Sequence, residues 1–122
     1  MARAWLTAGH VATRTGVAAE VATGLRERNF GTLVGSSSAG FDWRIDAPGG
    51  ESLAVFVQCS VVAISEALRG DEMPLLVAHG GTLLVLAGAL GVSLEPAMQA
   101  NAVPLMFRRA GIAWEVLRLG KV

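Results

Sequence analysis

The longest apolar stretch of the chain runs from Pro74 to Gly91, and a polar, glycine-rich turn divides it into two parts. Residues 75–78 have the length of a fully buried strand, and Pro74 stands where its missing N–H does least harm. The part from Thr82 to Gly91 is apolar on every side at helical spacing, which is typical of a buried helix. The pattern therefore predicts a strand, a turn at His79-Gly80-Gly81 and a helix.

The other elements follow from weaker periodicity and from glycine and proline positions. They are a helix over 2–15 that ends at Gly16, a strand over 17–23, a helix over 52–69 that ends at Gly70, and a hairpin of strands 101–109 and 112–119. Gly111 supplies the positive φ that a tight hairpin turn needs, and Pro104 confines the first hairpin strand to an edge. This order predicts a layered α/β domain, with a mostly parallel sheet flanked by helices and an antiparallel addition.

Length and composition restrict the class of protein to which this chain can belong. The 122 residues allow one domain with a real core, so residues 1–122 are expected to form a single domain. Ten basic and ten acidic residues cancel, which removes the net-charge argument for a nucleic-acid or acidic-membrane partner. The single Cys59 excludes an internal disulfide and fits a reducing compartment, and no signal peptide opens the chain, so we expect a cytoplasmic protein.

A membrane protein is the alternative that the apolar content raises. Residues 74–94 are long enough to span a bilayer, which takes about 20 residues. The turn at His79-Gly80-Gly81 interrupts this run, and the uninterrupted part after it is too short. The run therefore indicates a strand and a helix in a soluble core.

The turn at His79 is the first candidate for chemistry. A strand followed by a glycine pair and a helix aims backbone N–H groups and a positive helix end at an anion. His79 stands at the carboxyl end of the predicted strand, where open α/β sheets bind ligands. A lone histidine beside a glycine turn more often has a structural role. The turn alone therefore does not decide whether His79 is structural or functional.

Three charged or titratable side chains would suit phosphate chemistry together with this turn. Arg3 can present a guanidinium fork to phosphate oxygens, and Glu27 can donate or accept a proton. His79 can stabilise charge on a phosphoryl oxygen, aided by the N–H groups of Gly80 and Gly81. Taken singly, Arg3 and Glu27 also fit ordinary solvated charges. With few histidines and cysteines and no close carboxylate cluster, we expect neither a metal nor another cofactor.

Several segments, in order along the chain, resemble motifs of the histidine phosphatase superfamily, which includes the cofactor-dependent phosphoglycerate mutases. Residues 3–8 are similar to its R-A-x-x-T-A segment, and residues 25–31 to its L-x-E-R-x-[FY]-G motif. Residues 49–52 match G-G-E-S, residues 75–81 resemble the strand that ends in H-G-G, and Asn101-Ala102 resembles the N-A of a late strand. These matches cover nearly the whole chain.

The resemblance implies a mechanism through a phosphohistidine, whose nucleophile belongs to an R-H-G motif. It assigns phosphate binding to Arg3, proton donation to Glu27 and contact with the transferring phosphoryl group to His79. The 122 residues contain no R-H-G, and His10 lies in a different context. We therefore expect a C-terminal portion of a longer ancestral frame, in which Met1 is an internal methionine, and no turnover by the chain as printed.

Two hypotheses from different classes follow. The first is a phosphohydrolase that acts on a small phosphomonoester, a phosphatase rather than a mutase, because residues 32–48 are shorter than the insertion of the mutases resembled here. The second is a non-catalytic phosphate-binding or interaction domain. The resemblance also implies a vacant position beside strand 75–78, which predicts self-association.

Overall fold

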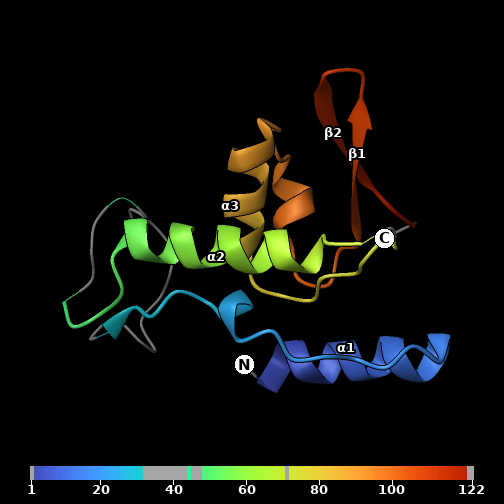
Figure 1. Ribbon diagram of the computed structural model, residues 1–122, viewed down its shortest axis with the longest axis horizontal. Coiled ribbons are helices and arrows are strands. Elements are labelled where there is room, and N and C mark those ends of the chain that lie inside the picture. Colours follow the sequence, from blue (N-terminus) through green and yellow to red (C-terminus); the bar gives the residue numbers. More distant parts are fainter. Residues whose placement is uncertain (1, 32–43, 45–47, 71, 121–122) are drawn as a thin grey trace. The chain divides into compact units, whose positions relative to one another are not determined.

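The computed structural model of the chain describes residues 2–31, 44, 48–70 and 72–120. Their elements, in order, are α1 (Ala2–Thr15), η1 (Thr23–Leu25), α2 (Leu53–Ala67), α3 (Gly80–Leu90), η3 (Pro96–Gln99), β1 (Leu105–Ala110) and β2 (Ala113–Arg118) (Figure 1). Contacts along the chain define two compact units, Met1–Thr82 and Leu83–Val122. The description as a single domain stays a prediction.

The first two helices form where the sequence predicts them, because their ends carry the expected residues. The α1 helix stops at Gly16, whose φ of 73° is left-handed and whose N–H donates to the Ala12 carbonyl at 2.9 Å. At the start of α2 the Ser52 hydroxyl accepts the Val55 N–H at 3.2 Å, as an N-cap does. Gly70, just beyond α2, also has a positive φ.

The buried apolar side chains of the described residues are few. They are Phe56, Ala63 and Ile64 of α2 and Ala87 of α3. The 3-10 helix η1 packs on α2, where a Cβ at Gly24 would lie 2.6 Å from the Ala63 side chain. The α2 helix therefore anchors the first unit, and it places Phe56 near the candidate site.

After Gly16 the chain turns back along α1 (Figure 1). The half-buried residues of α1 include Ala4, Ala8, Val11 and Ala12, which share one helical face. An open cavity of about 370 Å³ adjoins this face. It is lined by Ala8, Val11, Ala12, Thr15, Val17, Ala18, Ala19, Ala67, Glu72, Met73, Pro74, Leu75 and Val77.

Two segments with strand-like sequences, residues 17–21 and 73–78, do not pair with any described strand. We call them the extended runs. Among the described residues neither run makes a backbone-to-backbone hydrogen bond, and Val21 and Leu75 are 67% and 63% exposed. The predicted strands 17–23 and 75–78 are therefore not formed here. The physical reason is that a strand requires a neighbour for its N–H and C=O groups, which propensity alone does not supply.

The described sheet is the antiparallel pair β1 and β2, in register from Leu105↔Arg118 to Ala110↔Ala113. Gly111 has the predicted positive φ, of 66°, in the turn. The hairpin prediction is confirmed, although β1 starts after Pro104 and not at Asn101. A mixed helix and sheet architecture is thus present, but the predicted mostly parallel sheet is not confirmed among the described residues.

The apolar run that suggested a membrane span contains a helix, as the sequence predicts, but the predicted strand before it is not formed and Gly80 and Gly81 belong to the helix. Its helical part is α3, which begins at Gly80 and ends at Leu90, so it starts two residues before the predicted Thr82. None of the helices in the described ranges combines the length and apolar character needed to cross a membrane.

Candidate functional site

The candidate site lies at the amino end of α3, inside the first unit. The run 73–78 leads to His79, and Gly80 and Gly81 form the first turn of the helix. The first N–H groups of an α-helix have no partner within the helix, so they point outward as donors with a partial positive charge. His79 is half-buried, and its ring makes no hydrogen bond to another described residue.

The carboxylate of Glu27 sits directly on this helix end. The Gly81 N–H donates to Glu27 Oε2 at 3.4 Å, a long hydrogen bond, and the Arg28 N–H donates to Oε1 at 2.9 Å. Glu27 lies in the loop that follows η1, far from Gly81 in the sequence. The tertiary structure therefore brings the loop that carries Glu27 to the first turn of α3. There the carboxylate lies against the backbone N–H groups at the amino end of the helix.

Gly81 allows this close approach because it has no side chain. A Cβ there would collide with Glu27 Oε1 and would lie 3.0 Å from the Cζ atom of Phe56. Phe56 is 1% exposed, so its ring has little room to move. Gly80, by contrast, has nothing within 4 Å of such a Cβ. The two glycines of the turn thus have different roles, and only Gly81 is required by packing.

The charges around His79 have opposing effects on its protonation. Burial lowers the pKa of His79 below its usual 6.5, the negative charge of Glu27 raises this pKa, and the positive charge of Arg3 lowers it. Burial is the largest of these causes, so the imidazole is neutral at pH 7. A neutral ring offers one N–H donor and one acceptor to a ligand.

Arg3 is exposed on the first turn of α1. Its charge acts on the same imidazole as that of Glu27. The structure therefore brings Glu27, Gly81 and His79 into one site and places the charge of Arg3 within electrostatic reach of it. The catalytic and phosphate-binding roles of these residues remain proposals.

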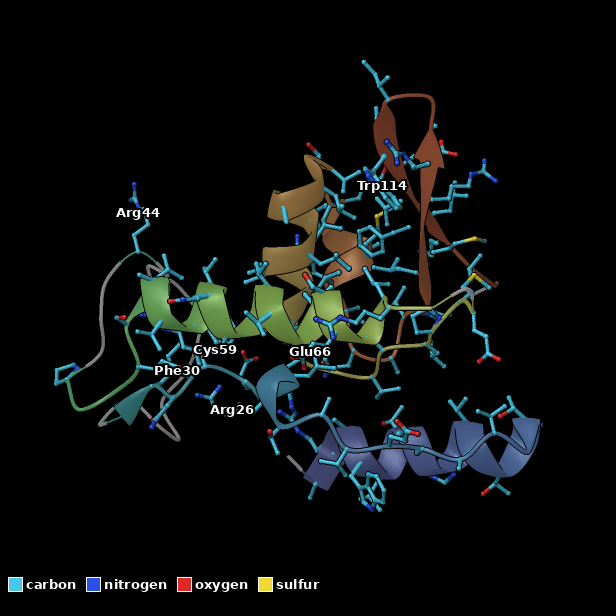
Figure 2. All side chains as sticks on the ribbon, viewed as in Figure 1. Arg26, Phe30, Arg44, Cys59, Glu66 and Trp114 are labelled. Carbon is cyan, nitrogen blue, oxygen red and sulfur yellow. The ribbon has the colours of Figure 1, made fainter. Side chains whose placement is uncertain are left out.

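Sequence reasoning missed the hydrogen bonds that hold the Glu27 loop. Segment 26–31 is joined to segment 49–52 at the start of α2, and we call this pair of segments the clasp. Arg26 and Phe30 of the clasp lie on the chain that runs beside α2, the helix that carries Cys59 (Figure 2). Arg28 is only 2% exposed, its Nε donates to the Glu51 carbonyl at 3.1 Å, and its guanidinium lies 5.7 Å from the Phe30 ring centroid.

A signal for this role was present in the sequence. Glu51 appeared there only as part of the G-G-E-S match. Arg26 and Arg28 stand on either side of Glu27 in the sequence. Arginine side chains form strong hydrogen bonds with carboxylates, so a contact with a distant glutamate such as Glu51 is chemically reasonable. No group of three or more His, Cys, Asp and Glu side chains gathers as a metal site would within the described ranges.

Comparison with known proteins identifies the family of the chain. The family model of the histidine phosphatase superfamily (branch 1) matches residues 1–106. The match covers most of the chain, so this protein belongs to the histidine phosphatase superfamily. Comparison with curated proteins and with solved structures yields no match.

Proposed function

We propose that this chain forms the phosphate-binding and proton-donating part of a phosphohydrolase site for a small phosphomonoester. The observation that carries the proposal is the contact of the Glu27 carboxylate with the Gly81 N–H, at the helix end beside His79. It combines an acid–base group, an outward-pointing amide and an imidazole in one place. A phosphate ester needs each of these groups, as a proton source and as donors to its oxygens.

Each group has a role that follows from its chemistry. The neutral His79 ring donates a hydrogen bond to a phosphoryl oxygen, the Gly80 amide adds a backbone donor, and the Gly81 amide does so when phosphate replaces Glu27 as its acceptor. Glu27, when protonated, gives a proton to the leaving oxygen. The Arg3 guanidinium adds a positive charge for the phosphate dianion. Family membership and the geometry at Gly81 support these roles.

A second candidate function is a non-catalytic phosphate-binding or interaction domain. The observation that favours it is that the 122 residues hold no R-H-G motif, so this chain by itself has no counterpart of the family's nucleophile. Without a nucleophile the site binds a phosphate but has no route to a covalent step. We propose binding, without turnover, for the chain as printed.

Finer features of the proposal rest on the family and on composition. The short segment 32–48 supports a phosphatase over a mutase, although most of that segment lies outside the described residues. The family supports a layered α/β fold with a mostly parallel sheet, in which the extended runs would be strands. The single Cys59 supports the cytoplasm as the compartment. The proposed partner is a small phosphorylated metabolite.

The binding proposal is tested by titrating the purified chain with inorganic phosphate. Nuclear magnetic resonance should show saturable shifts of the His79 ring and of the Gly80 and Gly81 amides. The His79→Asn variant should lose this saturation, whereas His10→Asn, at an exposed position on α1, should keep it. Shifts that are spread over the whole surface, or that survive His79→Asn, would contradict the proposal.

Turnover is tested separately with an aryl phosphate. We expect no release above that of the combined Glu27→Gln and His79→Ala variant. Release above this control that is lost on His79→Ala alone would show that another residue of the chain supplies the nucleophile. Comparing the two assays separates binding from catalysis, because phosphate saturation does not require a covalent step.

A further inference from the structure

We propose that Glu51 is a positioning residue, which holds the Glu27 carboxylate at the amino end of α3 through the clasp. Among the described residues Glu51 makes no hydrogen bond to Gly81 or His79, and its side chain binds the segment that carries Glu27. Its relevance to phosphate chemistry rests on the proposed function, but the placement of Glu27 does not.

The bonds of Glu51 join both sides of the clasp. Arg26 Nη2 donates to Glu51 Oε2 at 2.8 Å, and the Asn29 N–H donates to Oε1 at 3.3 Å. The backbone takes part as well, because the Glu51 N–H donates to the Asn29 carbonyl at 2.7 Å and Arg28 Nε donates to the Glu51 carbonyl at 3.1 Å. Glu51 therefore binds residues on both sides of Glu27, which restricts where the Glu27 side chain can go.

The start of α2 connects the clasp to the site. Glu51 directly precedes Ser52, the N-cap of α2, and Phe56 in the next turn lies against Gly81. The same helix thus supplies the anchor for the Glu27 loop and the wall beside the glycine that Glu27 contacts. The backbones of the two clasp segments also approach each other closely. A Cβ at Gly50 would lie 2.6 Å from the Asn29 carbonyl oxygen, so glycine is needed there to keep the spacing between the segments.

The charge of Glu51 is needed for this role. Its side chain is 7% exposed, whereas that of Arg26 is 40% exposed, so the ion pair is buried on the Glu51 side. A buried carboxylate is costly without such partners, and replacing it by an amide removes the ion pair while keeping an acceptor for the Asn29 N–H. Among the described residues, the charged side chains that act on the pKa of His79 are Glu27 and Arg3, not Glu51.

This separation of charges gives a direct test. The pKa of His79 is measured by nuclear magnetic resonance in the wild type, Glu27→Gln, Glu51→Gln and the double variant. In the wild-type background Glu27→Gln should lower the pKa, because the raising effect of the carboxylate is lost. In the Glu51→Gln background the same change should lower it by less, because Glu27 is no longer held beside the ring.

Matched variants separate positioning from general destabilisation. Glu115→Gln removes a carboxylate from the Arg108 ion pair of the hairpin, and it should leave the effect of Glu27→Gln unchanged. Arg26→Gln breaks the ion pair at its exposed end and should act like Glu51→Gln, whereas Arg26→Lys should restore the effect. If Glu51→Gln does not fold, the Arg26 variants give the answer.

Two results would overturn the proposal. One is an equal effect of Glu27→Gln on the His79 pKa with and without the Glu51–Arg26 pair. The other is no effect of Glu27→Gln in the wild type. The measurement uses no phosphate, so failure of phosphate binding leaves this result intact, and failure here leaves the binding assay intact.

Discussion

The clasp and the extended runs belong to the same unit, yet they are built in opposite ways. In the clasp, charged side chains are buried and hydrogen-bonded, as Arg28 and Glu51 are, and the backbones of the two segments touch. In the extended runs, apolar side chains such as Val21 and Leu75 are exposed. Hydrophobic content therefore does not by itself decide which part of this chain is buried.

The contrast shows that a segment becomes paired only where another segment of the chain can bond to it. In the clasp, the polar groups of each segment form hydrogen bonds with the other segment. In the hairpin, the backbone groups of β1 pair with those of β2 across a short turn. The extended runs have the residues of strands but no described neighbour that pairs with them. Apolar side chains left in water in this way favour association with another surface.

The largest effect that would sharpen the contrast is self-association through the extended runs. Light scattering on the freshly purified chain should show species larger than a monomer, because exposed apolar segments with unpaired backbone groups can pair with another chain. Leu75→Lys and Val21→Lys should shift the population toward monomer. Ile112→Lys, at the fully exposed hairpin turn, is the control and should not. A monodisperse monomer with a cooperative melt would rule this out.

A second effect concerns core packing in the two regions. Phe56→Ala should lower the free energy of unfolding by about 3–5 kcal/mol, because a fully buried ring is removed. Leu75→Ala, in the exposed run, should change it by no more than about 0.5 kcal/mol. Denaturant unfolding measures both. Equal costs for the two changes would mean that Leu75 is buried in solution, and the contrast would break.

A smaller effect is expected at the glycine that contacts both the clasp and α2. Gly81→Ala should destabilise the fold by about 1–3 kcal/mol, because the new methyl group overlaps Glu27 and Phe56. Gly88→Ala in the same helix has free space, and it should stabilise the helix by up to about 1 kcal/mol. Thermal unfolding of the two variants compares them. If Gly81→Ala is as harmless as Gly88→Ala, Glu27 does not occupy the helix end.

The smallest effect is the pH dependence at His79, which directly follows the extended run 73–78 and feels the charge of Glu27. Its pKa is lower in the folded chain than the unfolded value of 6.5, so its contribution to stability is complete above pH 6.5 and is lost as the pH falls through the folded pKa. Unfolding measured from pH 8 to 5 should show this loss, and His79→Gln should reduce it. A slope that His79→Gln leaves unchanged would assign the loss to other groups.

Much of the local structure follows from sequence because its causes are local. Gly16 predicts the end of α1 and Gly111 the hairpin turn, since a helix end or a positive φ depends on neighbouring residues alone. The family assignment follows as well, because the ordered segments indicated the superfamily whose model matches residues 1–106.

The sequence misplaced the structure where the partner is distant. Residues 17–23 and 75–78 have strand composition, but a ladder depends on a neighbour that no local pattern specifies. The start of α3 at Gly80 was also missed, because glycine has low helix propensity and only packing overrides it. The same limit explains why the contacts of Arg28 and Glu51 were not predicted.

The sequence by itself thus determined the end of α1, the hairpin and the family, all of which depend on local chemistry or motif order. Only the tertiary structure decided that Glu27 meets Gly81, that Phe56 closes the space beside them, and that Glu51 ties down the loop between Arg26 and Asn29. The reason is physical. Contacts between residues far apart in the chain depend on the shapes of whole segments once packed, and no single segment contains that information.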